Sequence, residues 1–339
     1  MILRSNDRLW DKYIDNLPIE KQDVYYTRQY SKMSELIQGG EAELFIYEDN
    51  NNIALYPYIR HILDYRDGDS LFYDIETAYG YGGPIVKKND ADFEAAFEKA
   101  FLKYCQTENI IAEFLRFHPL LENEKIFRRK IDVLHNRKTV WIDLEKDLDK
   151  IWMQDISTQN RNIVKKCIKN GLRVEISEDY DEFLEIYNQT MKKVQANKFY
   201  FFNKTYYDSV KSNPCCLLMR VRKDCDTLAA AIFMEYGDYF HYHLSGSKQE
   251  FLKLTPNNIL LWEAIKYAKM KGYKKLHLGG GLSDLEEDSL FRFKKKFSSE
   301  YKDFYIGKRV HNLKVYEKLI EKWESEHGEK AKILLQYRL

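Results

Sequence analysis

A short segment near the end of the chain combines the residue types that a group-transfer site needs. Residues 274–297 read KKLHLGGGLSDLEEDSLFRFKKKF, in which three glycines follow a short apolar strand. Glycines at a strand end let a ligand approach the backbone closely, so Gly279 and Gly280 are candidate substrate contacts. The acids that follow, including Asp284, can take a proton, and the cations, including Lys294, can hold an anionic carrier. This order predicts a transferase site; the alternative is a glycine loop beside a solvated, charged helix start.

A histidine-bearing strand at residues 239–245, YFHYHLS, offers a second set of groups. Strict alternation would place Tyr239, His241, His243 and Ser245 on one face. Transfer of a group to a nucleophile generally requires that the nucleophile lose a proton and that the charge developing on the donor be stabilised. His243 is a candidate base, and the alternative is a pair of hydrogen-bonded, half-buried histidines.

Lys294 is the candidate that would stabilise the oxyanion or a carrier phosphate. The sequence contains no paired Ser-His-Asp or Cys-His signature. Direct attack of the acceptor on a bound donor therefore fits better than a covalent enzyme intermediate.

Two further segments could contact a substrate. The helical pattern at residues 157–170 carries a basic run with Arg161 and Lys165, which suits the phosphates of a nucleotide-, lipid- or RNA-linked substrate, or else forms a solvated helix face. In Tyr79-Gly80-Tyr81-Gly82-Gly83-Pro84, the tyrosines Tyr79 and Tyr81 could stack on a sugar, or the segment could be a tight turn against the core.

The composition limits the class of protein. The chain has 339 residues, which allows two domains, and 54 basic against 53 acidic residues give a net charge of +1. Such a balance excludes a general nucleic-acid binder, so no DNA partner is expected. Five cysteines without a paired CxxC spacing argue against a disulfide framework or a zinc site, and no metal is expected. The sequence has no signal peptide and no apolar run that could span a membrane, which predicts a cytoplasmic protein.

The element pattern repeats along the chain. Residues 44–60 and 217–236 each predict two strands around a polar turn. Each pair precedes a further strand, an amphipathic helix and another short strand, so we expect a structural duplication within an α/β fold with mixed sheets. The first domain is expected to comprise residues 1–148, with 305–339 packing back onto it. The second, residues 149–304, should hold the active site.

Four segments together resemble one family. They are residues 79–84, the helix Arg161-x-x-x-Lys165-Lys166 that ends at Gly171, the helix of residues 258–272 that leads into Leu276-His277-Leu278-Gly279-Gly280, and the run FKKKF at 293–297. In this order they are similar to the FemABX family of peptidoglycan branch-peptide aminoacyltransferases. They are equally similar to the FemAB-type acyltransferases found with surface-polysaccharide genes. The resemblance implies two tandem GNAT-like (acyl-CoA N-acyltransferase) domains and acyl transfer to an amine.

The resemblance also implies roles for particular residues. The Phe-Lys of the family's FK-x-x-F motif, which lies near the junction of acyl group and acceptor, corresponds to Phe293 and Lys294. The family's phosphate-binding arginine falls near residues 190–193, where this chain has lysines, so Lys193 becomes a candidate substrate contact.

The donor of the Fem enzymes is an aminoacyl-tRNA, and that of GNAT enzymes is an acyl-CoA held by a glycine-rich loop. Here that loop reads EFLKLTPNN, without glycines. Thr255 is a plausible N-cap and Pro256 the first helical residue, and such a helix end can still bind an anion. We therefore assign donor binding to Thr255, Asn257 and Asn258, with aminoacyl-tRNA and acyl-CoA both open.

These observations predict a FemAB-like N-acyltransferase that acts on an amine of a peptidoglycan or surface-polysaccharide precursor. The expected acceptor is a sugar or peptide linked to an anionic carrier. If the donor is an aminoacyl-tRNA, tRNA is a further partner, and if the precursor is lipid-linked, the protein would contact it at the membrane surface. One alternative is acetyl-CoA-dependent N-acetylation of a nucleotide- or lipid-linked amino sugar. Another is a catalytically inactive scaffold or binding protein of the same fold.

Overall fold

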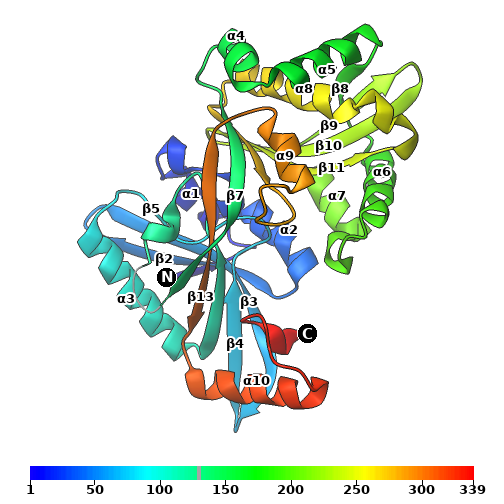
Figure 1. Cartoon of the computed structure of the whole chain (residues 1–339). Helices are drawn as coiled ribbons and strands as arrows, with labels where there is room; N and C mark the ends of the chain where they lie inside the picture. The colour runs from blue at the N-terminus through cyan, green and yellow to red at the C-terminus, as the bar shows by residue number, and fades with distance from the viewer. Residues whose placement is uncertain (128–130) are drawn as a thin grey trace. The chain divides into compact units, whose positions relative to one another are not determined.

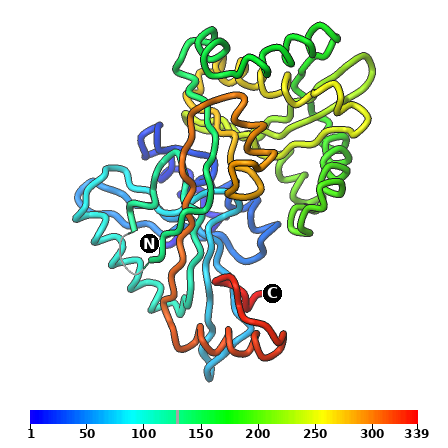
Figure 2. Tube along the Cα trace, in the orientation of Figure 1, coloured from blue at the N-terminus to red at the C-terminus, as the bar shows by residue number. Residues whose placement is uncertain are grey.

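The computed structural model describes residues 1–127 and 131–339, which form two compact units (Figure 1). Unit 1 is formed by Met1–Lys21, Tyr25–Asn136 and Phe304–Leu339, and unit 2 by Gln22–Val24 and Arg137–Asp303. The C-terminal residues Phe304–Leu339, red in Figure 2, are part of unit 1 together with the N-terminal segments drawn in blue and cyan. Residues 137–148, which the sequence assigned to the first domain, lie in unit 2.

The sheet of unit 1 has the strand order β1-β2-β3-β4-β6-β13, with β5 paired to β3. All neighbours are antiparallel except β4 and β6, which are parallel. The strands are β1 (Ile2–Arg4), β2 (Glu41–Asp49), β3 (Asn52–Asp67), β4 (Ser70–Glu76), β5 (Ile85–Val86), β6 (Ile110–Arg116) and β13 (Tyr301–Val310). The helices are α1 (Leu9–Asp15), α2 (Arg28–Gln38), α3 (Ala91–Thr107) and α10 (Leu313–His327), with short 3₁₀ turns at Ile19–Lys21, Val24–Tyr26, Asn123–Lys125 and Gln336–Arg338.

Helix α3 shows how the sequence builds the core of unit 1. The Asp90 side chain accepts hydrogen bonds from the backbone N–H groups of Asp92 and Phe93 and so starts the helix. Phe93, Phe97 and Phe101 then recur every four residues, which puts them on one helix face. Their rings are buried against the aromatic inner face of the sheet.

The sheet of unit 2 has the order β8-β9-β10-β11-β12-β7. Here β11 and β12 form the parallel pair. The strands are β7 (Asp132–Asp143), β8 (Arg173–Ser177), β9 (Cys216–Lys223), β10 (Asp226–Tyr236), β11 (Tyr239–Ser247) and β12 (Lys275–Gly280). The helices are α4 (Leu148–Lys150), α5 (Thr158–Lys169), α6 (Tyr180–Lys193), α7 (Lys204–Ser212), α8 (Pro256–Lys271) and α9 (Ser289–Lys295), with a π-helical turn at Ile151–Asp155 and 3₁₀ turns at Lys198–Tyr200 and Gln249–Leu254.

The predicted duplication is present in the strand order. In each unit a hairpin (β2–β3, β9–β10) is followed by an antiparallel strand, a long helix (α3, α8) and a strand parallel to the previous one. The final strand is exchanged: β7, which follows the strands of unit 1 in sequence, pairs with β12 in unit 2, and β13 pairs with β6 in unit 1. A local sequence pattern cannot reveal such an exchange, because it depends on pairing between distant segments.

Helices cover both faces of the unit 2 sheet (Figure 1). On one face α5 and α8 pack with Phe233 of β10 and Phe240 of β11 in a continuous apolar core. On the other face lie α6 and α7, and Tyr206 of α7 contacts His243 of β11. Strand β11 is therefore held from both sides as it approaches the candidate site.

Candidate functional site

The parallel strands β11 and β12 separate before they end. They pair only where Tyr239, Phe240 and His241 face Lys275, Leu276 and His277. Beyond these pairs, β11 runs on to Ser247 bonded to β10, and β12 runs on to Gly280 bonded to β7. Beyond His241 and His277, β11 and β12 are thus not paired with each other. We call this opening the strand split; its backbone N–H and C=O groups can bind an extended ligand.

A β-bulge at His243 shapes the strand split. Ile232 of β10 pairs with Leu244, whereas the next residue, Phe233, pairs with Tyr242, so His243 is the extra residue. The strict alternation predicted for residues 239–245 is therefore wrong after Tyr242. Past the bulge, Gly246 approaches α6 so closely that an added Cβ would lie 2.9 Å from the Ile186 carbonyl oxygen.

The Lys294 amine touches both strands that border the split. Lys294 lies on α9 and is only 7% exposed. Its Nζ donates a hydrogen bond of 2.7 Å to the carbonyl oxygen of Gly280 on β12 and lies 5.9 Å from the ring centroid of Tyr242 on β11.

The surroundings of Lys294 lower its pKa to about 7. Burial is the main cause, because it disfavours the charged form; the Asp288 carboxylate acts in the opposite direction and the Arg137 guanidinium adds to the lowering. Near neutral pH the amine therefore exists in both protonation states. Such a group can accept and return a proton.

The loop between β12 and α9 is held by Arg137 and Asp288. Arg137 donates a 2.6 Å hydrogen bond to the Gly281 carbonyl oxygen. Asp288 accepts hydrogen bonds from the backbone N–H groups of Leu282 (2.9 Å) and Ser283 (3.0 Å). An added Cβ at Gly281 would lie 2.3 Å from the Asp288 carboxylate, so the close approach requires glycine.

Asp288 also begins α9, because its other oxygen accepts a 2.8 Å hydrogen bond from the N–H of Phe291. Although partial burial raises the pKa of Asp288, these backbone hydrogen bonds outweigh it and lower the pKa. The sequence singled out Asp284, which is exposed in this loop. The acid that organises the loop is Asp288, and its place just before a short helix was the available signal.

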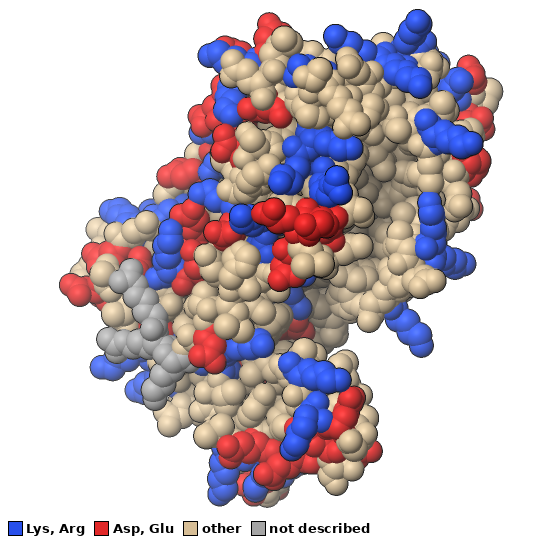
Figure 3. All heavy atoms as spheres, in the orientation of Figure 1, with Lys and Arg blue, Asp and Glu red and all other residues tan. Residues whose placement is uncertain are grey.

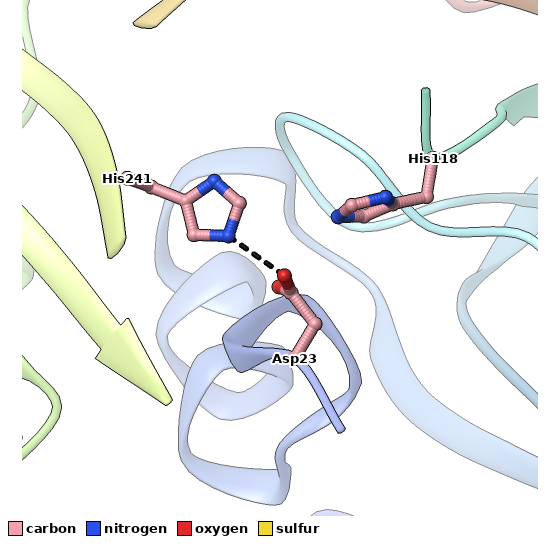
Figure 4. Close-up of side chains that lie close together, drawn as sticks. All are labelled: Asp23, His118 and His241. Atoms are coloured by element: carbon pink, nitrogen blue, oxygen red, sulfur yellow. Dashed lines mark hydrogen bonds and ion pairs between the residues drawn. The ribbon is translucent and has the colours of Figure 1, made fainter. Parts of the chain in front are cut away.

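The two histidines of β11 have different partners. His243 Nε2 lies 2.9 Å from the Tyr206 hydroxyl. Burial, together with the neighbouring His241, lowers the pKa of His243 to about 3, so its ring is neutral at physiological pH and a weak proton acceptor. His241 Nε2 lies 2.7 Å from an Asp23 carboxylate oxygen, and both side chains are buried (Figure 4). The sequence offered no local signal for Asp23, which is 218 residues away from His241.

The predicted phosphate-binding cations lie on α5 and α6. The Arg161 guanidinium donates to the carbonyl oxygens of Met153 (3.0 Å) and Ile156 (2.5 Å), so it closes the π-helical turn that precedes α5. Lys165 is exposed on α5, and Lys193 is exposed at the last residue of α6.

The predicted donor-binding residues lie where β11 leads into α8. Thr255 precedes Pro256 in a left-handed conformation (φ 53°), but its side chain does not cap the helix. Asn257 accepts a 3.1 Å hydrogen bond from the Ser247 hydroxyl and so joins the helix start to the end of β11. Asn258 is buried and donates 2.5 Å to the side-chain oxygen of Asn160, which links α8 to α5.

The predicted sugar-stacking tyrosines belong to unit 1. The Tyr79 carbonyl oxygen accepts a hydrogen bond from the Tyr30 hydroxyl, and the Tyr81 ring packs edge-on against Phe304 at 5.1 Å. The buried Asn123 amide donates to the carbonyl oxygens of Gly82 (2.7 Å) and Pro84 (2.8 Å), which fixes the turn. Phe293 lies beside Lys294 on α9, and its ring contacts Phe297 at 5.5 Å.

Unit 1 closes its own counterpart of the strand split. The parallel pair β4 and β6 is matched from Tyr73 to Glu76. Beyond that pair, the N–H of Thr77 donates a 3.0 Å hydrogen bond to the Phe114 carbonyl oxygen. The N–H of Gly82 donates a 2.8 Å hydrogen bond to the Arg116 carbonyl oxygen. Of the two parallel pairs in the described residues, only that of unit 2 is open.

Comparisons with known proteins agree with this architecture. Residues 158–295 match the family model of the acetyltransferase (GNAT) domain. The crystal structure of FemX is similar with a TM-score of 0.71 at 14% identity, over 94% of this chain and 99% of that chain. L-PGS from Bacillus licheniformis is similar with a TM-score of 0.58 at 14% identity, over 92% and 95% of the two chains. The C-terminal domain of a putative lysylphosphatidylglycerol synthetase from Agrobacterium fabrum is similar with a TM-score of 0.57 at 14% identity, over 90% of this chain and 93% of that chain. No curated protein sequence matches the chain.

The fold is therefore that of GNAT acyltransferases, as the sequence predicted, and the acetyltransferase (GNAT) domain match lies in residues 158–295. The whole chain shares the fold of FemX, and its second half matches the GNAT domain, which agrees with the predicted fold of two tandem GNAT-like domains. In the ranges 1–127 and 131–339, none of the helices is long and apolar enough to cross a membrane.

Proposed function

We propose that the chain is a cytoplasmic N-acyltransferase that moves an acyl or aminoacyl group onto an amine of a cell-envelope precursor by direct aminolysis. The observation that carries the proposal is the buried Lys294 amine, which contacts both sides of the strand split and has a pKa of about 7. The GNAT family match and the fold shared with FemX support acyl transfer as the reaction class.

In this proposal the acyl part of the donor lies along the strand split, where backbone groups of β11 and β12 that do not pair with each other hold it. The acceptor nitrogen attacks the acyl carbon and forms a C–N bond, while the bond from that carbon to the donor's oxygen or sulfur breaks. Neutral Lys294 accepts the proton that the amine loses, and that proton then passes to the leaving group. The Gly280 carbonyl oxygen, 2.7 Å from Nζ, stabilises the protonated amine. His243 is less suited to this role, because a pKa of about 3 makes it a weak base.

The acceptor in this proposal is a peptidoglycan or surface-polysaccharide precursor on an anionic carrier. Support comes from the fold of FemX and of two structures named as lysylphosphatidylglycerol synthetases or L-PGS. Phe293, Lys165 and Lys193 stay the predicted acceptor contacts in unit 2. The guanidinium of Arg161 would have to bind phosphate in addition to its backbone partners.

The donor is an aminoacyl-tRNA or an acyl-CoA, and no metal takes part in the proposed chemistry. The start of α8 at the end of β11, joined by Asn257 and Ser247, would place an anionic part of either donor near free helical N–H groups. The acetyltransferase family match favours a second candidate function, acetyl-CoA-dependent N-acetylation of a carrier-linked amino sugar.

The proposal is tested by mass spectrometry of products formed from acetyl-CoA or aminoacyl-tRNA with amino-sugar and peptide acceptors. Transfer should fall by about 10²-fold or more in Lys294→Ala, because the proton acceptor is lost. The matched control is Arg292→Ala, on the same helix but exposed, which should keep wild-type turnover. Equal turnover in Lys294→Ala and wild type would refute the assigned role, and no turnover with any donor would favour the inactive scaffold.

A further inference from the structure

Three consecutive aromatic side chains are exposed at one end of unit 2. They belong to the connection between α6 and α7, and the exposed apolar side chains there are Val194 (52%), Phe199 (41%), Tyr200 (40%) and Phe201 (37%). Among the exposed large hydrophobic residues of the described chain, no other three are consecutive in sequence. Contiguous exposed apolar groups usually mark a surface that contacts another apolar phase.

The connection has a defined structure that presents these rings. The Asn197 side chain accepts a 2.9 Å hydrogen bond from the N–H of Phe199 and starts the 3₁₀ turn Lys198–Tyr200. The Asn203 side chain accepts a 2.9 Å hydrogen bond from the N–H of Tyr206 and starts α7. Between them only Phe202 turns inward, where its ring lies 4.6 Å from that of Tyr206. The buried Phe202 therefore anchors the segment while its neighbours face solvent.

The segment that carries these rings is basic. Residues 186–207 contain four lysines and no acid or arginine. Lys204 forms an ion pair with Asp208, which leaves Lys192, Lys193 and Lys198 as exposed cations beside the aromatics. Basic side chains project at this end of unit 2, at the right of the face drawn in Figure 3. Elsewhere on that face, acidic and basic side chains are interspersed.

We propose that residues 192–201, the interfacial segment, dock this protein on the surface of an anionic lipid bilayer. Aromatic rings with an apolar body settle at the level of the lipid headgroups, and lysines on long stems reach the anionic phosphates. Apolar burial and electrostatic attraction together supply the two signals that reversible membrane binding needs. The inference does not depend on the proposed reaction, because lipid binding is measured without turnover, although Lys193 is shared with the predicted acceptor contacts.

The composition favours a bilayer over RNA as the occupant. RNA-binding surfaces add planar arginines for phosphate recognition to their stacking aromatics, and residues 174–219 contain no arginine. The aliphatic Val194 cannot stack on a base, but it can enter the headgroup region of a membrane.

The test is flotation of the full chain with vesicles of phosphatidylcholine alone or mixed with an equal part of phosphatidylglycerol. Wild type should float with the anionic vesicles and remain unbound with the neutral ones. The variant Phe199→Ser/Tyr200→Ser/Phe201→Ser should bind at least about tenfold more weakly, because the apolar contact is lost. The variant Lys192→Gln/Lys193→Gln/Lys198→Gln should lose roughly fivefold per lysine.

Matched controls separate this segment from general effects of surface change. Ile168→Ser/Ile176→Ser/Met270→Ser removes exposed apolar groups elsewhere in unit 2, and Lys166→Gln/Lys169→Gln/Lys271→Gln removes exposed lysines. Both should float as wild type does, and all variants should keep the wild-type melting temperature.

A Tyr200→Trp variant gives an independent readout. Its additional tryptophan emission, relative to wild type, should shift to the blue with anionic vesicles and be quenched by lipids brominated near the headgroup. Unchanged flotation of the aromatic variant, or no spectral shift on bound vesicles, would overturn the proposal. The proposal would also be overturned if the protein did not bind vesicles but bound tRNA through the same residues, because the segment would then be an RNA-binding surface.

Discussion

At the scale of single residues, Lys294 is the group whose protonation state decides between two chemical roles. A proton acceptor must be neutral, whereas an oxyanion or phosphate ligand must be charged. With a pKa of about 7, the neutral form grows as the pH rises through neutrality. If Lys294 is the base, kcat/KM should rise about tenfold per pH unit below pH 7 and level off above it.

The variant Lys294→Arg distinguishes the same two roles without a pH series. Arginine stays charged at all accessible pH values, so it can serve an oxyanion or a phosphate but cannot accept a proton. We expect Lys294→Arg to be as inactive as Lys294→Ala. Substantial activity in the arginine variant would instead support the charge-stabilising role that the sequence suggested.

The same residue should affect stability in a pH-dependent way. The pKa of Lys294 is about 7 when folded and near its ordinary 10.5 when unfolded, so between these values the unfolded chain binds more protons. The contribution of Lys294 therefore makes the free energy of unfolding rise with pH across this window. Below pH 7 the folded protein buries a charged amine, so the destabilisation by Lys294 reaches its full value there.

Lys294→Met should thus be more stable than wild type at pH 6, by an amount of the order of a few kcal/mol, and the difference should shrink toward pH 9. Urea denaturation at both pH values measures it. A constant difference between the two proteins would show that Lys294 titrates normally in the folded state.

At the scale of elements, Asp288 holds the loop after β12 and the start of α9 in one place. Asp288→Ala removes the helix cap and the hydrogen bonds to the N–H groups of Leu282 and Ser283. We expect a loss of about 1–2 kcal/mol in the free energy of unfolding and a lower kcat, because Lys294 sits on the displaced helix. Glu287→Ala, exposed in the same loop, is the control and should match wild type in chemical denaturation.

The elements that the sequence predicted best were those with a local signal. The hairpins around Asp49-Asn50-Asn51-Asn52 and Lys223-Asp224-Cys225-Asp226, and the helix that begins at Pro256, lie where the turn residues and the proline place them. The alternation of residues 239–245 failed because a bulge depends on register with β10, not on the strand's own pattern.

At the scale of the whole molecule, the C-terminus is part of the fold of unit 1. Arg338 forms ion pairs with Asp74, which is fully buried, and with Glu76, and the Tyr337 hydroxyl donates 2.8 Å to Asp74. Burial alone would raise the pKa of Glu76, but the nearby His61 ring, 3.4 Å from a Glu76 oxygen, and the charges of Arg116 and Arg338 lower it. The stabilisation that these contacts give unit 1 is therefore complete above the ordinary pKa of a glutamate, and it is lost gradually as the pH falls from there through the lowered pKa of folded Glu76.

Arg338→Ala should destabilise the chain by about 3–5 kcal/mol, because it leaves a buried carboxylate without its cation. The control is Arg4→Ala, which removes an exposed ion pair with Glu41 and should change the stability by less than about 1 kcal/mol. Thermal unfolding at pH 7 compares the two, and similar melting temperatures for both variants would argue against the C-terminal contact.

The sequence by itself determined the fold class and the duplication, because these depend on local patterns of apolar residues and turns, and it drew attention to the segment around Lys294. Only the tertiary structure decided the exchange of β7 and β13, the separation of β11 from β12, and the pairing of Asp23 with His241. The tertiary structure also decided which group has a shifted pKa. The pKa of Lys294 is lowered because residues distant in sequence bury its amine and remove it from water. Strand pairing and burial are properties of the assembled chain, and a single segment does not encode them.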